Sequence, residues 1–282
     1  MPDLQWLREL FSFNKRHIPD PLWRSCVARI PLLHRLSSAD LLRLKGLAEE
    51  LLRTKTITGA AGMEITDEVA VTIVAQAALP VLNLTLDLYS DIPGIVVYPS
   101  AFVVRQKQVD PFGIVHEWRE TLAGQAMDAG GSIVLSWEYV ADNSFFGARG
   151  NVVIHEFAHK IDMQRHGANG CPRFVYPYHQ GMQVGVWERA FNAAYQDFRH
   201  RVHSFERPLH ISADTPPDVL QQLHEQGRRP LPMDPYAAKN PAEFFAVASE
   251  VFFVDPTLLA ADYPDIYQLL ARYYLQKPLA GR

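Results

Sequence analysis

Two histidines four residues apart, with a glutamate directly after the first, constrain this chain more than any other feature. They are His155, Glu156 and His159. On a helix, residues four apart lie one turn apart on the same face, so both imidazoles can point at one position in space. Such a pair supplies half of a tetrahedral zinc site, and the glutamate can reach a water on the metal without being a ligand. The motif predicts a metal-dependent peptide hydrolase with Glu156 as its general base.

The sequence around the motif predicts a buried helix. Asn151 fits the N-cap position, most of the following residues are apolar, and Gly167 is a natural stop. Burying a His-Glu-His group is costly unless a metal or a hydrogen-bond network compensates. An ordinary amphipathic helix with two satisfied histidines is the alternative, because the pattern fixes only three positions.

Asp162 falls on the same helical face as both histidines. Two interpretations stay open. Its carboxylate can accept a hydrogen bond from the nitrogen of a histidine that does not face the metal. Otherwise it is a solvated helix residue or part of a salt bridge.

A catalytic zinc ion takes three protein ligands and keeps one position open. The best candidate for the third ligand lies in residues 240–253, an almost entirely apolar stretch that begins with Asn240 and Pro241 and so predicts a buried helix. It carries two carboxylates two turns apart, Glu243 and Glu250. The residues alone favour Glu243 as the ligand only slightly, because Glu243 can complete a capping box instead. Glu250 can bind the metal or orient a histidine.

The composition is that of an ordinary soluble globular protein, with 282 residues, 48% hydrophobic and 21% charged. A net charge of −4 gives no electrostatic reason to expect nucleic acid or an anionic membrane as a partner. The two cysteines, Cys26 and Cys171, fit a reducing cytosol. The N-terminus has no signal-peptide pattern and no stretch approaches transmembrane length, so we expect a cytoplasmic protein.

Hydrophobic periodicity predicts mostly helices before residue 90 and strands between residues 94 and 140. The expected helices are a stripe from Trp6 to Phe11, a short helix from Leu22, residues 39–53 capped by Ser38, residues 66–79, a continuation over residues 82–89, and residues 187–202. The expected strands are residues 55–59, 94–98, 115–122 and 132–140, with a turn-rich link over residues 124–131.

Residues 132–140 give the strongest strand pattern and run directly toward the histidine helix. Such a strand often forms the sheet edge on which a substrate backbone can pair. A plain central strand is an equally good interpretation. Residues 203–235 are rich in proline and charge, contain a possible helix over 218–226, and are predicted to be a variable segment beside the site.

Residues 155–162 (HEFAHKID) followed by residues 240–247 (NPAEFFAV) resemble the Mlc titration factor A family. The stretches at 95–99 (IVVYP) and 133–137 (IVLSW) support the resemblance, which extends over most of the chain. That family consists of bacterial zinc metallopeptidases similar to the catalytic domain of anthrax lethal factor. The paired motifs are far more specific than the histidine motif alone, although segment 203–235 looks longer than in typical members.

The resemblance implies a site residue by residue. His155 and His159 match the histidine ligands of zinc, Glu243 the third ligand, and Glu156 the general base. Tyr236 matches a tyrosine that assists at the transition state; its alternative is a core tyrosine near a helix entry. The family is credited with aminopeptidase activity on small peptides and with binding the glucose repressor Mlc.

We therefore expect an α+β, zincin-like metallopeptidase fold with a mixed sheet. It would form one catalytic domain over residues 1–282, with an N-terminal lobe to about 166 and a C-terminal helical lobe from 167. The expected function is that of a zinc-dependent, aminopeptidase-type enzyme with a regulatory role through an Mlc-type repressor. One alternative is a non-catalytic regulator that sequesters the repressor. A weaker one, a structural zinc domain, lacks a cysteine placed to supply a fourth ligand.

Overall fold

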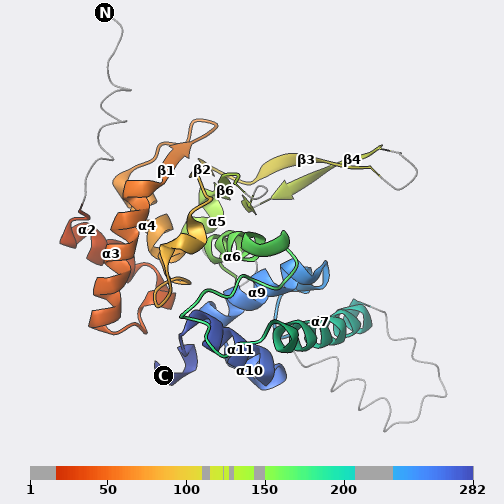
Figure 1. Cartoon of the computed structure of the whole chain (residues 1–282). Helices are drawn as coiled ribbons and strands as arrows, with labels where there is room; N and C mark the ends of the chain where they lie inside the picture. The colour runs from red at the N-terminus through yellow and green to blue at the C-terminus, as the bar shows by residue number, and fades with distance from the viewer. Residues whose placement is uncertain are drawn as a thin grey trace, which may run out of the picture.

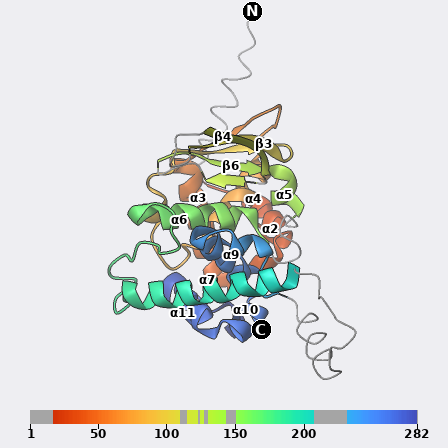
Figure 2. The same ribbon diagram turned by 90° about the vertical axis from the view of Figure 1, so that its right-hand side faces the viewer.

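The computed structural model of the chain describes residues 17–109, 115–122, 124–126, 130–142, 150–206 and 231–281. A small sheet lies at one end of the molecule, and helices are layered beneath it (Figures 1 and 2). The α+β class and the mixed sheet are as predicted. The predicted stripe from Trp6 to Phe11 lies outside the described residues.

The first described helices are α2 (Asp20–Ala28), α3 (Ser38–Thr54) and α4 (Asp67–Ala78), with a short 3-10 turn η1 (Pro31–Leu33) after α2. Helix α4 begins as predicted, because the side chain of Thr66 accepts a hydrogen bond from the amide of Val69. The predicted cap of α3 was wrong by one residue. Ser37, and not Ser38, accepts from the amide of Asp40, the geometry of an N-cap.

The main sheet has the order β1-β2-β6-β5. Strands β1 (Thr56–Gly59), β2 (Gly94–Tyr98) and β6 (Ile133–Ser136) run parallel, and β5 (Gly124–Ala126) pairs antiparallel with β6. Strands β3 (Phe102–Val109) and β4 (Val115–Leu122) form an antiparallel hairpin that extends away from this sheet (Figure 1).

The strand predicted over residues 132–140 is wrong in its second half. Strand β6 ends at Ser136, and residues Trp137–Asp142 form helix α5. Its neighbour β2 ends at Tyr98, which pairs with Ser136, and Pro99 follows. One more hydrogen bond follows that pair, from the amide of Glu138 to the carbonyl of Pro99 at 3.2 Å, but proline has no amide hydrogen with which to continue the ladder. Residues 137–140, three of which are aromatic or β-branched, therefore have no strand to join, and propensity alone does not keep them extended.

The topology also decides between the two interpretations of this strand. Strand β6 lies between β2 and β5, so it is a central strand and not an edge. The edge next to the histidine helix is β5, inside the segment predicted as a turn-rich link. A three-residue strand is too short to produce a recognisable alternating pattern.

The helical continuation expected over residues 82–89 is wrong as well. Only Leu86–Tyr89 is helical, as the 3-10 turn η2, and Thr85 caps it by accepting from the amide of Asp87. Pro80 ends α4, because a proline ring interferes with the helix before it.

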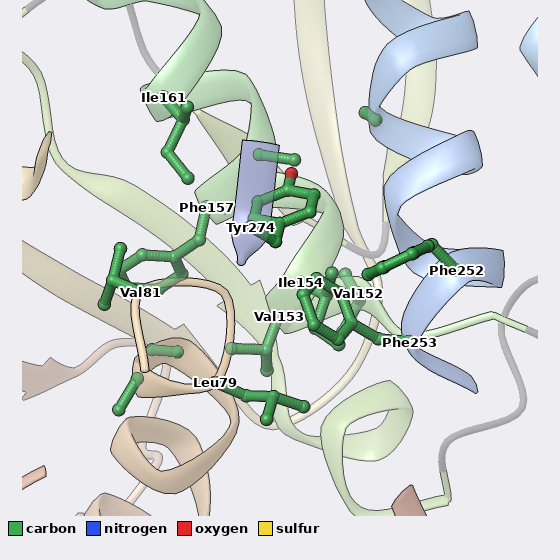
Figure 3. Packing of buried hydrophobic residues seen from close by; sticks show 14 of the residues in the cluster. Leu79, Val81, Val152, Val153, Ile154, Phe157, Ile161, Phe252, Phe253 and Tyr274 are labelled. Carbon is green, nitrogen blue, oxygen red and sulfur yellow. The ribbon is translucent and has the colours of Figure 1, made fainter. Parts of the chain in front are cut away.

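Helix α6 (Val152–His166) lies at the centre of the molecule and packs against α4, β5, β6 and α9 (Pro241–Val254) (Figures 1 and 2). Its apolar side chains gather with Leu79, Val81, Phe252 and Phe253 in the core (Figure 3). The remaining elements are α7 (Val184–Glu206), η4 (Pro235–Ala238), α10 (Thr257–Asp262), α11 (Pro264–Tyr274) and η5 (Pro278–Gly281).

Within the expected variable segment 203–235, the structure describes residues 203–206, which belong to α7 (Val184–Glu206), and residues 231–235, which lead into η4 (Pro235–Ala238). The predicted helix over residues 218–226 lies outside the described residues. Among the helices that the structure describes, none combines the length and apolar character needed to cross a bilayer.

Candidate metal centre

Helix α6 carries the two histidines, and its local sequence sets where it begins and ends. The side chain of Asn151 accepts a hydrogen bond from the amide of Ile154 at 2.9 Å, as an N-cap does. At the other end Gly167 has a φ of +80°, which an L side chain rarely adopts. Residues 152–162 of this helix are all buried, with His155 3% exposed and His159 8%.

The two imidazoles converge as their spacing predicts. The Nε2 atoms of His155 and His159 lie 3.1 Å apart, and the ring centroids are 4.7 Å apart. Each ring therefore presents the same nitrogen to one position above the helix.

Helix α9 brings Glu243 to this position from far along the chain. Asn240 caps the helix by accepting the amide of Glu243 at 2.9 Å, and Pro241 takes the first helical position. Glu243 thus lies in the first turn, where its Oε2 atom is 3.1 Å from Nε2 of both His155 and His159. Its carboxylate faces the histidines.

These three ligand atoms, mutually 3.1 Å apart, suit a small tetrahedral ion. Bonds of about 2.0–2.1 Å at tetrahedral angles place neighbouring ligand atoms roughly 3.3 Å apart. A neutral His155 that donates from Nδ1 to Glu250 turns the lone pair of Nε2 toward the Glu243 carboxylate. Two acceptors at this distance repel each other unless a cation or a proton lies between them. The residues present therefore fit a metal ion.

The electrostatics of the cluster agree with this. Burial lowers the pKa of His155, but the carboxylates of Glu250 and Glu243 outweigh burial and hold the pKa well above its ordinary value. Burial raises the pKa of Glu243, yet hydrogen bonds from both histidines leave it well below its usual range. The cluster thus favours a positive charge among the ligand atoms.

Glu156 lies beside this cluster and beneath the edge strand. Glu156 is only 4% exposed. A Cβ atom at position 124 would lie 2.5 Å from Oε1 of Glu156 and 2.8 Å from Cγ2 of Val152. Glycine at position 124 therefore lets the backbone of β5 approach the glutamate closely.

Tyr236 reaches the site from η4. Its hydroxyl donates to Oε1 of Glu243 at 3.2 Å, and its ring centroid is 6.2 Å from that of His155. The Nζ atom of Lys239 donates to the same hydroxyl at 3.0 Å and lies 4.8 Å from the ring centroid. Tyr236 is thus next to the candidate ligands, at a position from which a hydroxyl can reach a bound group.

Glu250, two turns along α9 from Glu243, lies behind His155. One carboxylate oxygen pairs with Nδ1 of His155, and the other accepts from the backbone amide of Asn151 at 2.7 Å. The residue is completely buried. Of the two roles considered for Glu250, this geometry fits the one that orients a histidine, because the carboxylate lies on the side of the ring away from Glu243.

Asp162 is also completely buried, so the interpretation as a solvated residue is wrong. Its Oδ2 atom accepts from the amide of Gly170 at 2.7 Å, which ties the loop after α6 back to the helix. Burial raises the pKa of Asp162 to about 6. Neither its Oδ1 atom nor Nδ1 of His159 has a hydrogen-bond partner among the described residues, so the bond to a histidine, the other interpretation considered for Asp162, is not formed in this structure.

Three residues of this site were not identified from the sequence. Gly124 stands in a segment too short to be recognised as a strand. Lys239 follows Tyr236 by three residues, a spacing without a known motif. Gln76 accepts a hydrogen bond from Nδ2 of Asn151 at 2.6 Å. It is the amide side chain in a helix that is otherwise mostly Val, Ala and Ile, and this isolated polar residue is a signal that could have drawn attention to it.

Comparisons with known proteins agree with the geometry. Residues 4–275 match the profile of a family described as glucose-regulated metallo-peptidase M90. The chain is 36% identical over 259 residues to Mlc titration factor A of Serratia proteamaculans (strain 568), which covers 92% of this chain and 88% of the relative. It is 35% identical over 252 residues to Mlc titration factor A of Yersinia pestis (strain Pestoides F), with 89% and 83% covered.

Proposed function

The chain belongs to the family of glucose-regulated metallo-peptidases M90, and on this premise we propose that it is a zinc-dependent peptidase with a zincin-like fold and an aminopeptidase-type activity. The observation that carries the proposal is the convergence of His155, His159 and Glu243 beside Glu156. In this proposal the whole chain is one catalytic domain, with its N-terminal lobe reaching to about residue 166.

Zinc is the metal that this ligand set favours. Two imidazoles and one carboxylate are a common set of protein ligands for catalytic zinc, and they leave a fourth position for water or substrate. When bound, zinc supplies Lewis acidity that polarises a peptide carbonyl and makes a water molecule acidic near neutral pH.

Glu156 acts as the general base in this proposal. Its carboxylate takes the proton of the attacking water and then delivers a proton to the amine that leaves. Its place on α6 directly after His155 supports the role, because the glutamate of this motif can reach a water on the metal without being a ligand itself.

Tyr236 stabilises the negative charge that develops on the carbonyl oxygen. Its hydroxyl donates to Glu243 in this structure, so it would turn from that carboxylate to the substrate during the reaction. Glu250 holds the ring of His155 by its Nδ1 atom and keeps Nε2 aimed at the site.

The substrate backbone is proposed to pair with β5. One side of this strand is bonded to β6, and no strand among the described residues pairs with its other side. An extended peptide can add to such an edge through main-chain hydrogen bonds. Because Gly124 touches Glu156, a peptide held there would lie next to the general base.

The names of the relatives support a second candidate function. Mlc titration factor A is a name that connects those proteins with the repressor Mlc. We propose that this chain binds an Mlc-type repressor in the cytoplasm, where its free cysteines, Cys26 and Cys171, would stay reduced. With a net charge of −4 it would act on the repressor without touching nucleic acid itself. The alternative, a regulator without catalysis, keeps only this function.

The test combines metal analysis with a panel of chromogenic aminoacyl substrates and internally quenched peptides. The zinc-loaded protein should cleave at least the aminoacyl substrates, and removal of the metal by a chelator should abolish cleavage until zinc is restored. A protein that binds zinc but cleaves nothing on the panel would count against the peptidase. Capture of an Mlc-type repressor by both the wild type and Glu156→Gln would then favour the non-catalytic regulator.

A further inference from the structure

Gln76 is a polar side chain at a buried helix position where an apolar residue is normally found. It lies in the last turn of α4, is completely buried, and has alanines on both sides. Burying an amide costs free energy unless its donor and acceptor are both hydrogen-bonded. A side chain such as leucine or methionine would fill the same space without that requirement.

Both ends of the Gln76 amide are bonded. Its Nε2 atom donates to the carbonyl of Thr72 at 3.1 Å, within its own helix. Its Oε1 atom accepts from Nδ2 of Asn151 at 2.6 Å. Gln76 therefore links α4 to the residue that begins the histidine helix.

Asn151 connects Gln76 to the candidate metal centre. While its side-chain oxygen caps α6, its backbone amide donates to Oε2 of Glu250 at 2.7 Å. The other oxygen of Glu250 pairs with Nδ1 of His155. A continuous series of buried hydrogen bonds thus runs from Gln76 through Asn151 and Glu250 to the imidazole.

The side-chain oxygen of Gln76 determines the orientation of the Asn151 side-chain amide. An Asn side chain has one oxygen and one NH₂ group, and the cap requires the oxygen to face Ile154. Gln76 stabilises the same orientation of the Asn151 side chain, because only the NH₂ group of Asn151 can donate to Oε1 of Gln76. With both ends of its amide fixed, Asn151 holds its backbone amide against Glu250, and two donors then fix the Glu250 carboxylate.

We infer that Gln76 is a positioning residue of the metal centre, which orients His155 by holding Asn151 against Glu250. The inference rests on the proposed metal site, but it does not require peptidase activity. Partners that orient a metal-binding histidine typically change metal affinity about 10- to 100-fold when removed. Gln76 acts from further away, so its removal should weaken binding by roughly 5- to 10-fold.

The experiment measures zinc affinity by competition with a chromophoric chelator, and the visible absorption of the cobalt-substituted protein. Gln76→Met keeps the length of the side chain and removes the acceptor. It should raise the zinc Kd about 5- to 10-fold and alter the cobalt spectrum, which reports ligand geometry. Ile73→Val, on the same buried helix, is the matched control. It should lower the melting temperature and leave the zinc Kd and the spectrum unchanged.

A second variant tests whether the effect passes through Asn151. Asn151→Ser keeps a good N-cap residue but is too short to donate to Gln76. If the two residues act in series, the double variant should bind zinc no more weakly than the weaker single variant. Additive losses, or a Gln76→Met protein with wild-type affinity and spectrum, would overturn the inference. A wild type that binds zinc but cleaves no peptide would count against the proposed function alone.

Discussion

The backbone of Gly124 lies directly against the side chain of Glu156. A Cβ atom at position 124 would stand 2.5 Å from Oε1 and 2.8 Å from Cγ of that glutamate, closer than real Cβ atoms approach their neighbours. The contact joins the edge strand of the sheet to the proposed general base. The position of the base is thus set partly by the strand on which the substrate is proposed to lie.

Gly124→Ala should impair catalysis without removing the metal. The added methyl group has to displace Glu156 or β5, and misplacing a catalytic group by about 1 Å costs on the order of 100-fold in rate. We expect kcat to fall by roughly 10- to 100-fold while the zinc content stays at the wild-type level. Gly46→Ala is the control, because its Cβ would meet nothing within 4 Å. Full activity of Gly124→Ala would show that the contact does not position the base.

Glu156→Gln should retain zinc and lose turnover. Glutamine has nearly the shape of glutamate but cannot take a proton from water, and general-base catalysis typically contributes about 10²- to 10⁴-fold. The expected result is a loss of kcat in that range with a zinc Kd close to that of the wild type. Steady-state kinetics on the most reactive substrate of the panel, together with metal analysis, measure both. Undiminished turnover would reject Glu156 as the base.

Glu243→Ala should greatly weaken zinc binding. Wild-type protein at a free zinc concentration of 100 times Kd gains about 2.7 kcal/mol of unfolding free energy, because the metal binds only the folded state. The variant lacks one of three ligands and should show little of this gain at the same zinc concentration. Thermal unfolding with and without zinc measures it, with exposed Glu64→Ala as the control. Stoichiometric zinc at wild-type affinity in Glu243→Ala would reject Glu243 as a ligand.

Motifs in which local spacing fixes geometry were predictable from the sequence. The His155 and His159 pair, the Asn151 cap and the Gly167 stop all follow from helix geometry within about four turns of chain. Strand β2 was likewise predicted with its observed bounds, since the parallel strand inside the sheet reads as a continuous apolar run.

Relationships between distant segments were not predictable from patterns of this kind. The sequence pattern alone left Glu243 and Glu250 nearly equal as candidate ligands. Only the packing of α6 against α9 shows that Glu243 faces Nε2 of His155 and Glu250 faces Nδ1. The end of β6 depends on Pro99, which directly follows the neighbouring strand β2, and no pattern within residues 132–140 contains that information. The contact of Gln76 with Asn151 spans 75 residues and has no local signature beyond an isolated amide.

Tyr236 and Lys239 should act on catalysis as one unit. If the Tyr236 hydroxyl stabilises charge only in the transition state, Tyr236→Phe should lower kcat by roughly 10²- to 10³-fold and change KM little. Lys239 donates to that hydroxyl at 3.0 Å, so Lys239→Met should lower kcat by a smaller factor. In the Tyr236→Phe background Lys239→Met should have no further effect, because its partner is already gone. Exposed Lys277→Met controls for the loss of a positive charge. If Lys239→Met costs as much activity in the Tyr236→Phe background as in the wild type, the lysine acts directly on the substrate and not through the tyrosine.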